Sequence, residues 1–157
     1  MNDQFEEFLK FLDALDRNNV EYILIGGVAI NIHGLDRLTR DVDIIVKLTP
    51  ENIDLLRKAL YSMYDDDSIE EITERELVSY PVIRYGTPHG FYIDIVNKLG
   101  DVFSFDNLDY EIINFKGIKI RVATPETLLN MKSDTVREKD KIDASFLKEL
   151  ILNKKKS

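Results

Sequence analysis

The chain has 157 residues, and its 44% hydrophobic content is enough to bury the core of one folded domain. Its 21 lysines and arginines against 29 aspartates and glutamates give a net charge of −8, which disfavours a general nucleic-acid-binding surface. Cysteine is absent and there are two histidines, so disulfides, thiol catalysis and cysteine-based metal sites are excluded, and a bound metal would need oxygen ligands, as Mg²⁺ and Mn²⁺ do.

The sequence contains no apolar run near the roughly 18 residues that a membrane-spanning helix needs. The N-terminus is acidic and amphipathic, unlike the basic start of a signal peptide. We therefore expect a cytoplasmic protein with no membrane partner.

Hydrophobic periodicity in the first half of the chain predicts helices and strands in alternation. The predicted elements are a helix over 3–16, a strand over 22–25, a short helix over 28–33, a strand over 40–47 and a helix from 50 to about 63. Thr49-Pro50 supplies a cap and a proline for the first turn of that last helix. The apolar run inside 40–47 indicates a central position in a sheet.

The second half predicts several strands followed by helices. The acidic segment 68–79 has no decisive period, although 70–76 favours a helix. The later predicted elements are strands over 80–85 and 90–96, a hairpin of 110–115 and 118–122 around Lys116-Gly117, and two helices between 126 and about 152 with a break near Arg137. This order predicts an α+β fold, a mixed sheet with helices on its faces, with a core over 1–123 and a small helical part over 124–157.

Asp41-Val42-Asp43 is the first motif with a chemical interpretation. In a strand, the two carboxylates point to one face about 6.5–7 Å apart, where they repel by roughly 2.5 kcal/mol at an effective dielectric constant near 20. Apolar neighbours on both sides disfavour full exposure, so a cation between the carboxylates is one interpretation. An exposed strand end with two solvated aspartates is the other.

Gly26-Gly27 and Asp94 are two further candidates. The glycines follow a strand and open a helix, where a bare backbone and a helix N-terminus can receive phosphate; an ordinary turn is the alternative. The sequence has neither a Gly-x-Gly-x-x-Gly fingerprint nor a P-loop. Asp94 is the one charged residue in the apolar stretch 91–96. Burying an unpaired carboxylate is costly, so we expect a cation, a salt bridge or an edge strand there.

In combination, these motifs resemble the signature of the DNA polymerase beta-like nucleotidyltransferase superfamily. Ile25-Gly26-Gly27 is followed after thirteen residues by Asp41-Val42-Asp43, and Asp94 takes the place of the later third carboxylate. The stretches 26–41 and 124–143 are similar to the small bacterial and archaeal branch, which includes abortive-infection toxin-like minimal transferases. Gly27 stands where that family often has serine, which leaves backbone contacts alone to hold phosphate.

The resemblance implies a nucleotidyltransferase-like mixed sheet and the transfer of a nucleoside monophosphate from an NTP, such as ATP, to a hydroxyl group, with pyrophosphate leaving. It implies that Asp41, Asp43 and Asp94 are catalytic and bind Mg²⁺ or Mn²⁺, while Gly26-Gly27 holds the triphosphate. Because a side chain at position 27 would occupy the phosphate space, we expect Gly27→Val to weaken NTP binding more than stability.

Four other side chains are expected near the nucleotide: Arg37, Thr39, Arg40 and Lys132. For both arginines an ion-pair role is the alternative, and Thr39 could bond either a phosphate or a carboxylate. Lys132 could instead be a surface lysine or a partner of Asp140. We expect an ion-paired helix junction made by Arg137, Lys139, Asp140 and Asp143.

Two other functions stay open from the sequence. One is a catalytically silent nucleotide-binding or toxin–antitoxin-type interaction protein of the same fold, which the presence of all three carboxylates disfavours. The other is an interaction domain whose acidic face binds a basic partner. If the chain is a transferase, its net charge favours a small-molecule or protein acceptor over long nucleic acid, with the end of a tRNA as the alternative.

Overall fold

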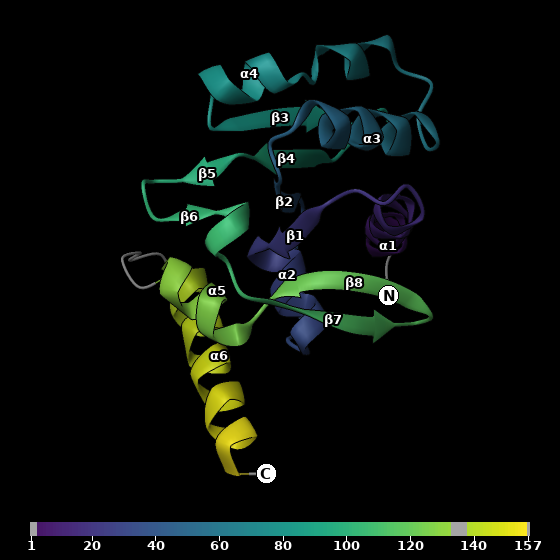
Figure 1. The fold of residues 1–157 in the computed structure, drawn as a ribbon. Helices are drawn as coiled ribbons and strands as arrows, with labels where there is room; N and C mark the ends of the chain where they lie inside the picture. Colours follow the sequence, from purple (N-terminus) through teal and green to yellow (C-terminus); the bar gives the residue numbers. More distant parts are fainter. Residues whose placement is uncertain (1–2, 133–137, 157) are drawn as a thin grey trace.

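A six-stranded mixed sheet forms the centre of the computed structural model, which describes residues 3–132 and 138–156 (Figure 1). The strand order is β3-β4-β2-β1-β8-β7. The strands are β1 (Tyr22–Ile25), β2 (Val42–Val46), β3 (Val82–Gly86), β4 (Tyr92–Val96), β7 (Tyr110–Phe115) and β8 (Ile118–Ala123). The pairs β2–β4 and β1–β8 are parallel, and the other neighbours are antiparallel. The predicted α+β fold with a mixed sheet is confirmed.

Helices lie around this sheet, and α5 and α6 lie side by side past the end of β8 that leads into α5 (Figure 1). The helices are α1 (Asp3–Arg17), α2 (Gly26–His33), α3 (Pro50–Tyr61), α4 (Glu74–Ser79), α5 (Pro125–Lys132) and α6 (Glu138–Lys156), with 3₁₀ turns η1 (Asp67–Glu71) and η2 (Phe105–Asn107). A two-stranded hairpin, β5 (Lys98–Leu99) with β6 (Phe103–Ser104), was not predicted. Within the described ranges, none of the helices is both long and apolar enough to cross a membrane.

The central strands are buried because helices cover them. All four residues of β1 are buried, as are four of the five in β2, the exception being Asp43. Phe8, Leu12 and Leu15 on one side of α1 are 0–1% exposed, as the apolar stripe of an amphipathic helix requires. Asp43 therefore lies on a strand that is otherwise part of the core.

The ends of several elements follow the local chemistry that the sequence predicts. The Thr49 hydroxyl accepts a hydrogen bond from the backbone N–H of Asn52 (3.1 Å), which caps α3. Lys116 and Gly117 join β7 to β8 with φ values of 51° and 82°, the pair of positive angles that a tight hairpin turn requires.

Two boundaries near the candidate motifs differ from the prediction. Helix α2 begins at Gly26, so it includes both glycines, and β2 begins at Val42, so that Arg40 and Asp41 precede the strand. The acidic segment after α3 forms η1 and α4, and its Asp66 accepts a hydrogen bond from the Tyr85 hydroxyl (2.7 Å). The predicted break near Arg137 lies outside the described residues, and the division of the chain at residue 123 stays a prediction.

Candidate functional site

Three charged side chains form a row across β2, β4 and β3. Asp43 on β2 is paired in register with Asp94 on β4, and Asp94 is paired with Arg84 on β3. Residues that face each other across neighbouring strands point to the same side of a sheet. The topology thus brings Asp43 and Asp94 together although they lie far apart in the sequence.

Arg84 binds the carboxylate of Asp94 in a two-pronged arrangement. Its Nε donates to Asp94 Oδ1 at 2.9 Å and its Nη2 donates to Asp94 Oδ2 at 3.1 Å. Nη2 also lies 3.5 Å from Asp41 Oδ2. Asp41 therefore joins the same group from the loop before β2, so that two of the three predicted carboxylates contact one guanidinium, and Asp43 is the cross-strand neighbour of Asp94.

Arg84 was not predicted from the sequence as a site residue. Its pairing with Asp94 depends on the register of β3 against β4, which the turn between the strands sets. The one signal for it in the sequence is an arginine inside the predicted strand 80–85, next in the chain to the strand that carries Asp94.

Asp43 is the most electrostatically perturbed of the three carboxyl groups. Burial first, then a hydrogen bond with the Asp94 side chain and the negative charges of Asp94 and Asp41, raise the pKa of Asp43 to about 7, against an opposing contribution from Arg84. The Asp43–Asp94 contact is a hydrogen bond when one carboxyl is protonated. The three carboxyl groups thus carry more negative charge than Arg84 alone neutralises. A proton shared between Asp43 and Asp94 neutralises part of the excess.

Gly26 allows the helix to begin against Asp43. A Cβ atom on Gly26 would lie 2.2 Å from Asp43 Oδ2, and the residue has φ +72°, a backbone conformation that glycine adopts with little strain. Helix α2 has no acidic residue in its first turn. Its free N–H groups and positive dipole end therefore lie next to the carboxylates, where they can receive an anion.

Gly27 does not border open space. A Cβ atom there would lie 2.9 Å from Arg37 Nη2 and 2.9 Å from Thr39 Cγ2. The expectation that Gly27→Val weakens NTP binding more than stability stays a prediction, but the added side chain would also meet Arg37 and Thr39 in the segment between α2 and β2, which adds a cost in stability. That segment closes over the glycine turn.

Arg37 and Lys132 both contact Asp143, whose side chain is 0% exposed. Arg37 Nη2 donates to Asp143 Oδ2 at 2.9 Å, Arg37 Nε lies 2.8 Å from Oδ1 without hydrogen-bond alignment, and Lys132 Nζ lies 3.1 Å from Oδ2. The ion pair joins α5 and α6 to the loop at the glycine turn. Of the predicted helix-junction residues, this structure describes the side chain of Asp143, whereas those of Arg137, Lys139 and Asp140 lie outside the description.

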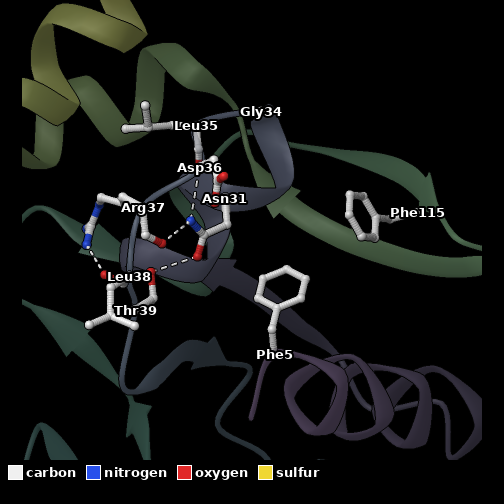
Figure 2. Close-up of a pocket in the computed structure, with 9 residues that line it drawn as sticks. All are labelled: Phe5, Asn31, Gly34, Leu35, Asp36, Arg37, Leu38, Thr39 and Phe115. Carbon is white, nitrogen blue, oxygen red and sulfur yellow. Dashed lines mark hydrogen bonds between the residues drawn. The ribbon is translucent and has the colours of Figure 1, made fainter. Parts of the chain in front are cut away.

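Thr39 and Arg40 have different environments. The Thr39 hydroxyl donates to Asn31 Oδ1 at 2.7 Å, and Asn31 Nδ2 donates to the backbone carbonyls of Leu35 and Arg37 (Figure 2). Asn31, which the sequence did not single out, thereby fixes the loop after α2. Arg40 is exposed.

A cavity of about 540 Å³ opens beside this loop (Figure 2). Phe5 and Phe115 lie on one side of it, across from the loop residues. It is lined by Phe5, Asn31, Gly34, Leu35, Asp36, Arg37, Leu38, Thr39 and Phe115. The three carboxylates are not among its lining residues, so the cavity and the charged row are separate features.

The donor set around Arg84 suits a hard divalent cation. Over residues 3–132 and 138–156, no group of three or more His, Cys, Asp or Glu side chains is already arranged to hold a metal ion, and Arg84 lies between Asp94 and Asp41. The three carboxyl groups nevertheless offer oxygen ligands. Burial first, and then the neighbouring negative charges, raise the pKa of Asp43, and Mg²⁺ or Mn²⁺ would neutralise those charges.

The fold and the sequence are similar to those of known proteins. A family model described as "Nucleotidyl transferase AbiEii toxin, Type IV TA system" matches residues 10–143. The lincosamide antibiotic adenylyltransferase LnuA, solved with lincomycin bound, is 20% identical, with a TM-score of 0.60 over 92% of this chain and 96% of its own. No curated protein sequence matches the chain.

Two further solved structures share the fold. A nucleotidyltransferase-like protein from Paracoccidioides brasiliensis is 20% identical, with a TM-score of 0.62 over 96% of this chain and 76% of its own. ANT(2'')-Ia, in complex with adenylyl-2''-tobramycin, is 15% identical, with a TM-score of 0.55 over 93% of this chain and 88% of its own. The predicted resemblance to nucleotidyltransferases is confirmed by the family match and by these folds.

Proposed function

The chain belongs to the AbiEii nucleotidyltransferase toxin family, and on that premise we propose that it transfers a nucleoside monophosphate from an NTP to a hydroxyl acceptor with the help of a divalent cation. The observation that carries the proposal is the convergence of Asp41, Asp43 and Asp94 next to the Gly26 turn. Three carboxylates beside a helix N-terminus that has neither a side-chain cap nor an acidic residue in its first turn offer one place for a cation and an adjacent place for phosphate.

Each part of the site has a role in the proposed transfer. The acceptor oxygen forms a bond to the α-phosphorus, the bond from that phosphorus to the β-phosphate oxygen breaks, and pyrophosphate leaves. Asp94 takes the proton of the acceptor hydroxyl, and the N–H groups at the start of α2 bind the triphosphate. Asp41, Asp43 and Asp94 would hold the cation, which neutralises the charge on the phosphates.

We assign supporting roles to the side chains around the glycine turn. Arg37 and Lys132 position the turn through buried Asp143, and Thr39 does so through Asn31. The exposed side chain of Arg40 is available to contact the NTP. These assignments favour a positioning role for Arg37, Thr39 and Lys132 over the direct nucleotide contacts expected from the sequence.

The acceptor that we favour is a small molecule or a protein. Tracking RNA requires many accessible cations, whereas Arg37 and Lys132 are largely buried in an ion pair and the net charge is −8. LnuA is an antibiotic adenylyltransferase and ANT(2'')-Ia was solved with an adenylylated tobramycin, so this fold accommodates small acceptors in other chains. The family description as a type IV toxin favours a protein partner that opposes the activity.

A labelling experiment tests the proposal while the acceptor is still unidentified. Each of the four NTPs, labelled at the α-phosphate, is incubated with the protein, Mg²⁺ or Mn²⁺, and separate small-molecule, RNA and protein fractions of a cell lysate. We expect one fraction to gain label while pyrophosphate is released. EDTA should abolish the labelling, and Asp43→Asn should lower it on the order of 10²–10⁴-fold because it removes a ligand of the cation, whereas the exposed control Asp101→Asn should not.

The other outcomes separate the competing functions. Binding of an NTP in a thermal-shift assay, with no labelled product in any fraction, would indicate the catalytically silent relative. No effect of NTP or cation on the melting temperature would contradict nucleotide binding altogether and leave an interaction domain. Label in the RNA fraction alone would preserve the transfer reaction and overturn the choice of acceptor.

A further inference from the structure

Arg84 lies between Asp94 and Asp41. In the proposed function, these two carboxylates hold the divalent cation. The Arg84 guanidinium lies against both oxygens of Asp94, at 2.9 and 3.1 Å, and 3.5 Å from Asp41 Oδ2. A divalent cation shared by Asp41 and Asp94 would need the same space and the same negative charge. Two cations held this closely repel each other strongly.

The surroundings of Arg84 hold its guanidinium beside the carboxylates but also allow it to move into solvent. The ring of Tyr92 lies under it, with 4.6 Å between the guanidinium carbon and the ring centroid. Gly86 makes room for that ring, because a Cβ atom at Gly86 would lie 3.2 Å from Tyr92 Cε1. The Arg84 side chain is 54% exposed on the edge strand β3, so it can move into solvent without burying its charge.

Asp94 is in the opposite situation, since its side chain is 16% exposed. A carboxylate with so little access to water needs a positive partner at all times. Arg84 meets this need in the chain without a metal, and a divalent cation would meet it in the loaded site.

We propose that Arg84 is a built-in counter-cation that holds Asp94 and Asp41 in place before the divalent cation arrives and competes with that cation for the two carboxylates. The inference rests on the proposed function, because it requires that these carboxylates bind the cation. It makes Arg84 a positioning residue that sets the cation concentration at which the site fills.

Manganese binding measures the competition directly. The affinity for Mn²⁺ alone is determined by titration calorimetry, or by the electron paramagnetic resonance signal of free Mn²⁺, for the wild type, Arg84→Met, Arg84→Lys and the control Arg75→Met. Arg75 is an exposed arginine on α4, so its variant reports the effect of one lost charge elsewhere. We expect Arg84→Met to bind Mn²⁺ about tenfold more tightly, Arg84→Lys to lie between it and the wild type, and Arg75→Met to match the wild type.

A second measurement uses the wild-type chain and does not depend on a variant that folds. In a nitrogen-15 NMR spectrum, the Arg84 Nε–H signal should shift when Mg²⁺ is added, because the hydrogen bond to Asp94 is released. The signals of other arginine side chains, such as Arg17 with its partner Asp13, should stay in place.

The outcomes distinguish this inference from the function on which it rests. Equal Mn²⁺ affinities in wild type and Arg84→Met, or an Arg84 signal that does not move at saturating Mg²⁺, would overturn the competition and leave the cation site intact. Weaker Mn²⁺ binding in folded Arg84→Met would also overturn it, since Arg84 would then assist the cation. An absence of Mn²⁺ binding in every variant would contradict both the competition and the proposed cation dependence.

Discussion

Gly26 packs against the Asp43 carboxylate, and a single added methyl group tests this contact. Gly26→Ala places a Cβ atom 2.2 Å from Asp43 Oδ2 and also forces alanine to adopt φ +72°. The positive φ alone costs about 1–2 kcal/mol, and displacement of Asp43 should add about 1 kcal/mol or more. Urea unfolding measures the loss in the free energy of unfolding.

Gly117→Ala is the matched control, since Gly117 has φ +82° and no atom within 4 Å of the added Cβ. It should therefore show the backbone cost alone. In an Asp43→Ala background, the cost of Gly26→Ala should fall toward that value, because the carboxylate is gone and only the contact with Cβ of residue 43, at 3.2 Å, remains. Equal costs for the two glycine variants in the wild-type background would mean that Asp43 does not constrain position 26.

The raised pKa of Asp43 makes the stability of the metal-free protein depend on pH. Its pKa is about 7 in the folded chain against an ordinary value of 3.8, so the folded state holds a proton that the unfolded state has released. The stabilisation from this group is complete below pH about 4 and is lost as the pH rises through about 7, on the order of a few kcal/mol. Asp94, Asp41 and Arg84 are the charged groups that face Asp43.

Asp43→Asn should remove this part of the pH dependence, because an amide needs no proton to bond Asp94. In EDTA, the variant should match the wild type near pH 4 and exceed its free energy of unfolding near pH 8. Asp101→Asn, at an exposed position, should follow the wild-type curve. A variant that is less stable than the wild type at both pH values would contradict the charge repulsion that we infer.

At the residue scale, the sequence predicts the groups whose chemistry is local. Asp41, Asp43 and Gly26 stand out in the sequence, since two aspartates beside an apolar run and a glycine pair after a strand are local signals, although Asp41 precedes β2. Arg84 does not stand out, because its partner is chosen by the register of β3 on β4. The crowding around Gly27 could not be predicted from the sequence either, because it comes from a loop that is held in place by Asp143 on α6.

At the element scale, Asn52 fastens α3 to the sheet and offers a test of the fold apart from the site. Its Oδ1 accepts from the Glu21 N–H at 2.7 Å, and its Nδ2 donates to the carbonyls of Glu21 at 2.9 Å and Lys47 at 2.8 Å. Asn52→Ala leaves three backbone groups without this partner and should cost about 2–4 kcal/mol.

The control for Asn52 is Lys58→Ala, an exposed position on the same helix. It should change the free energy of unfolding by no more than about 0.5 kcal/mol. The comparison is made by urea unfolding with both variants under the same conditions. A cost for Asn52→Ala no larger than that of the control would contradict a fastening role.

The main elements were predictable because their signals are local and strong. Strand β1 matches its predicted range, and the turn at Lys116-Gly117 joins β7 to β8 as expected. The hairpin of β5 and β6 was missed because two-residue strands leave no period to detect. The predicted start of β2 at residue 40 was too early. Arg40 and Asp41 come directly before the apolar run in the sequence, but the strand begins at Val42.

At the scale of the whole molecule, the pairing of charges limits what the protein can bind. Arg37 and Lys132 are committed to Asp143, and Arg84 to Asp94. We therefore expect a tRNA mobility shift at low salt to disappear at physiological ionic strength, because few phosphate contacts are available. Tight binding at physiological salt would contradict the preference for a small-molecule or protein acceptor.

The central claim is that the three carboxylates and the glycine turn form one site for a cation and a triphosphate. Crystals soaked with Mn²⁺ and a non-hydrolysable ATP analogue test it most directly, through the anomalous signal of manganese. We predict a manganese peak bound to oxygens of Asp41, Asp43 and Asp94, with Asp94 released from Arg84 and the phosphates against the N–H groups at the start of α2. Manganese and phosphates located away from these residues would contradict the account.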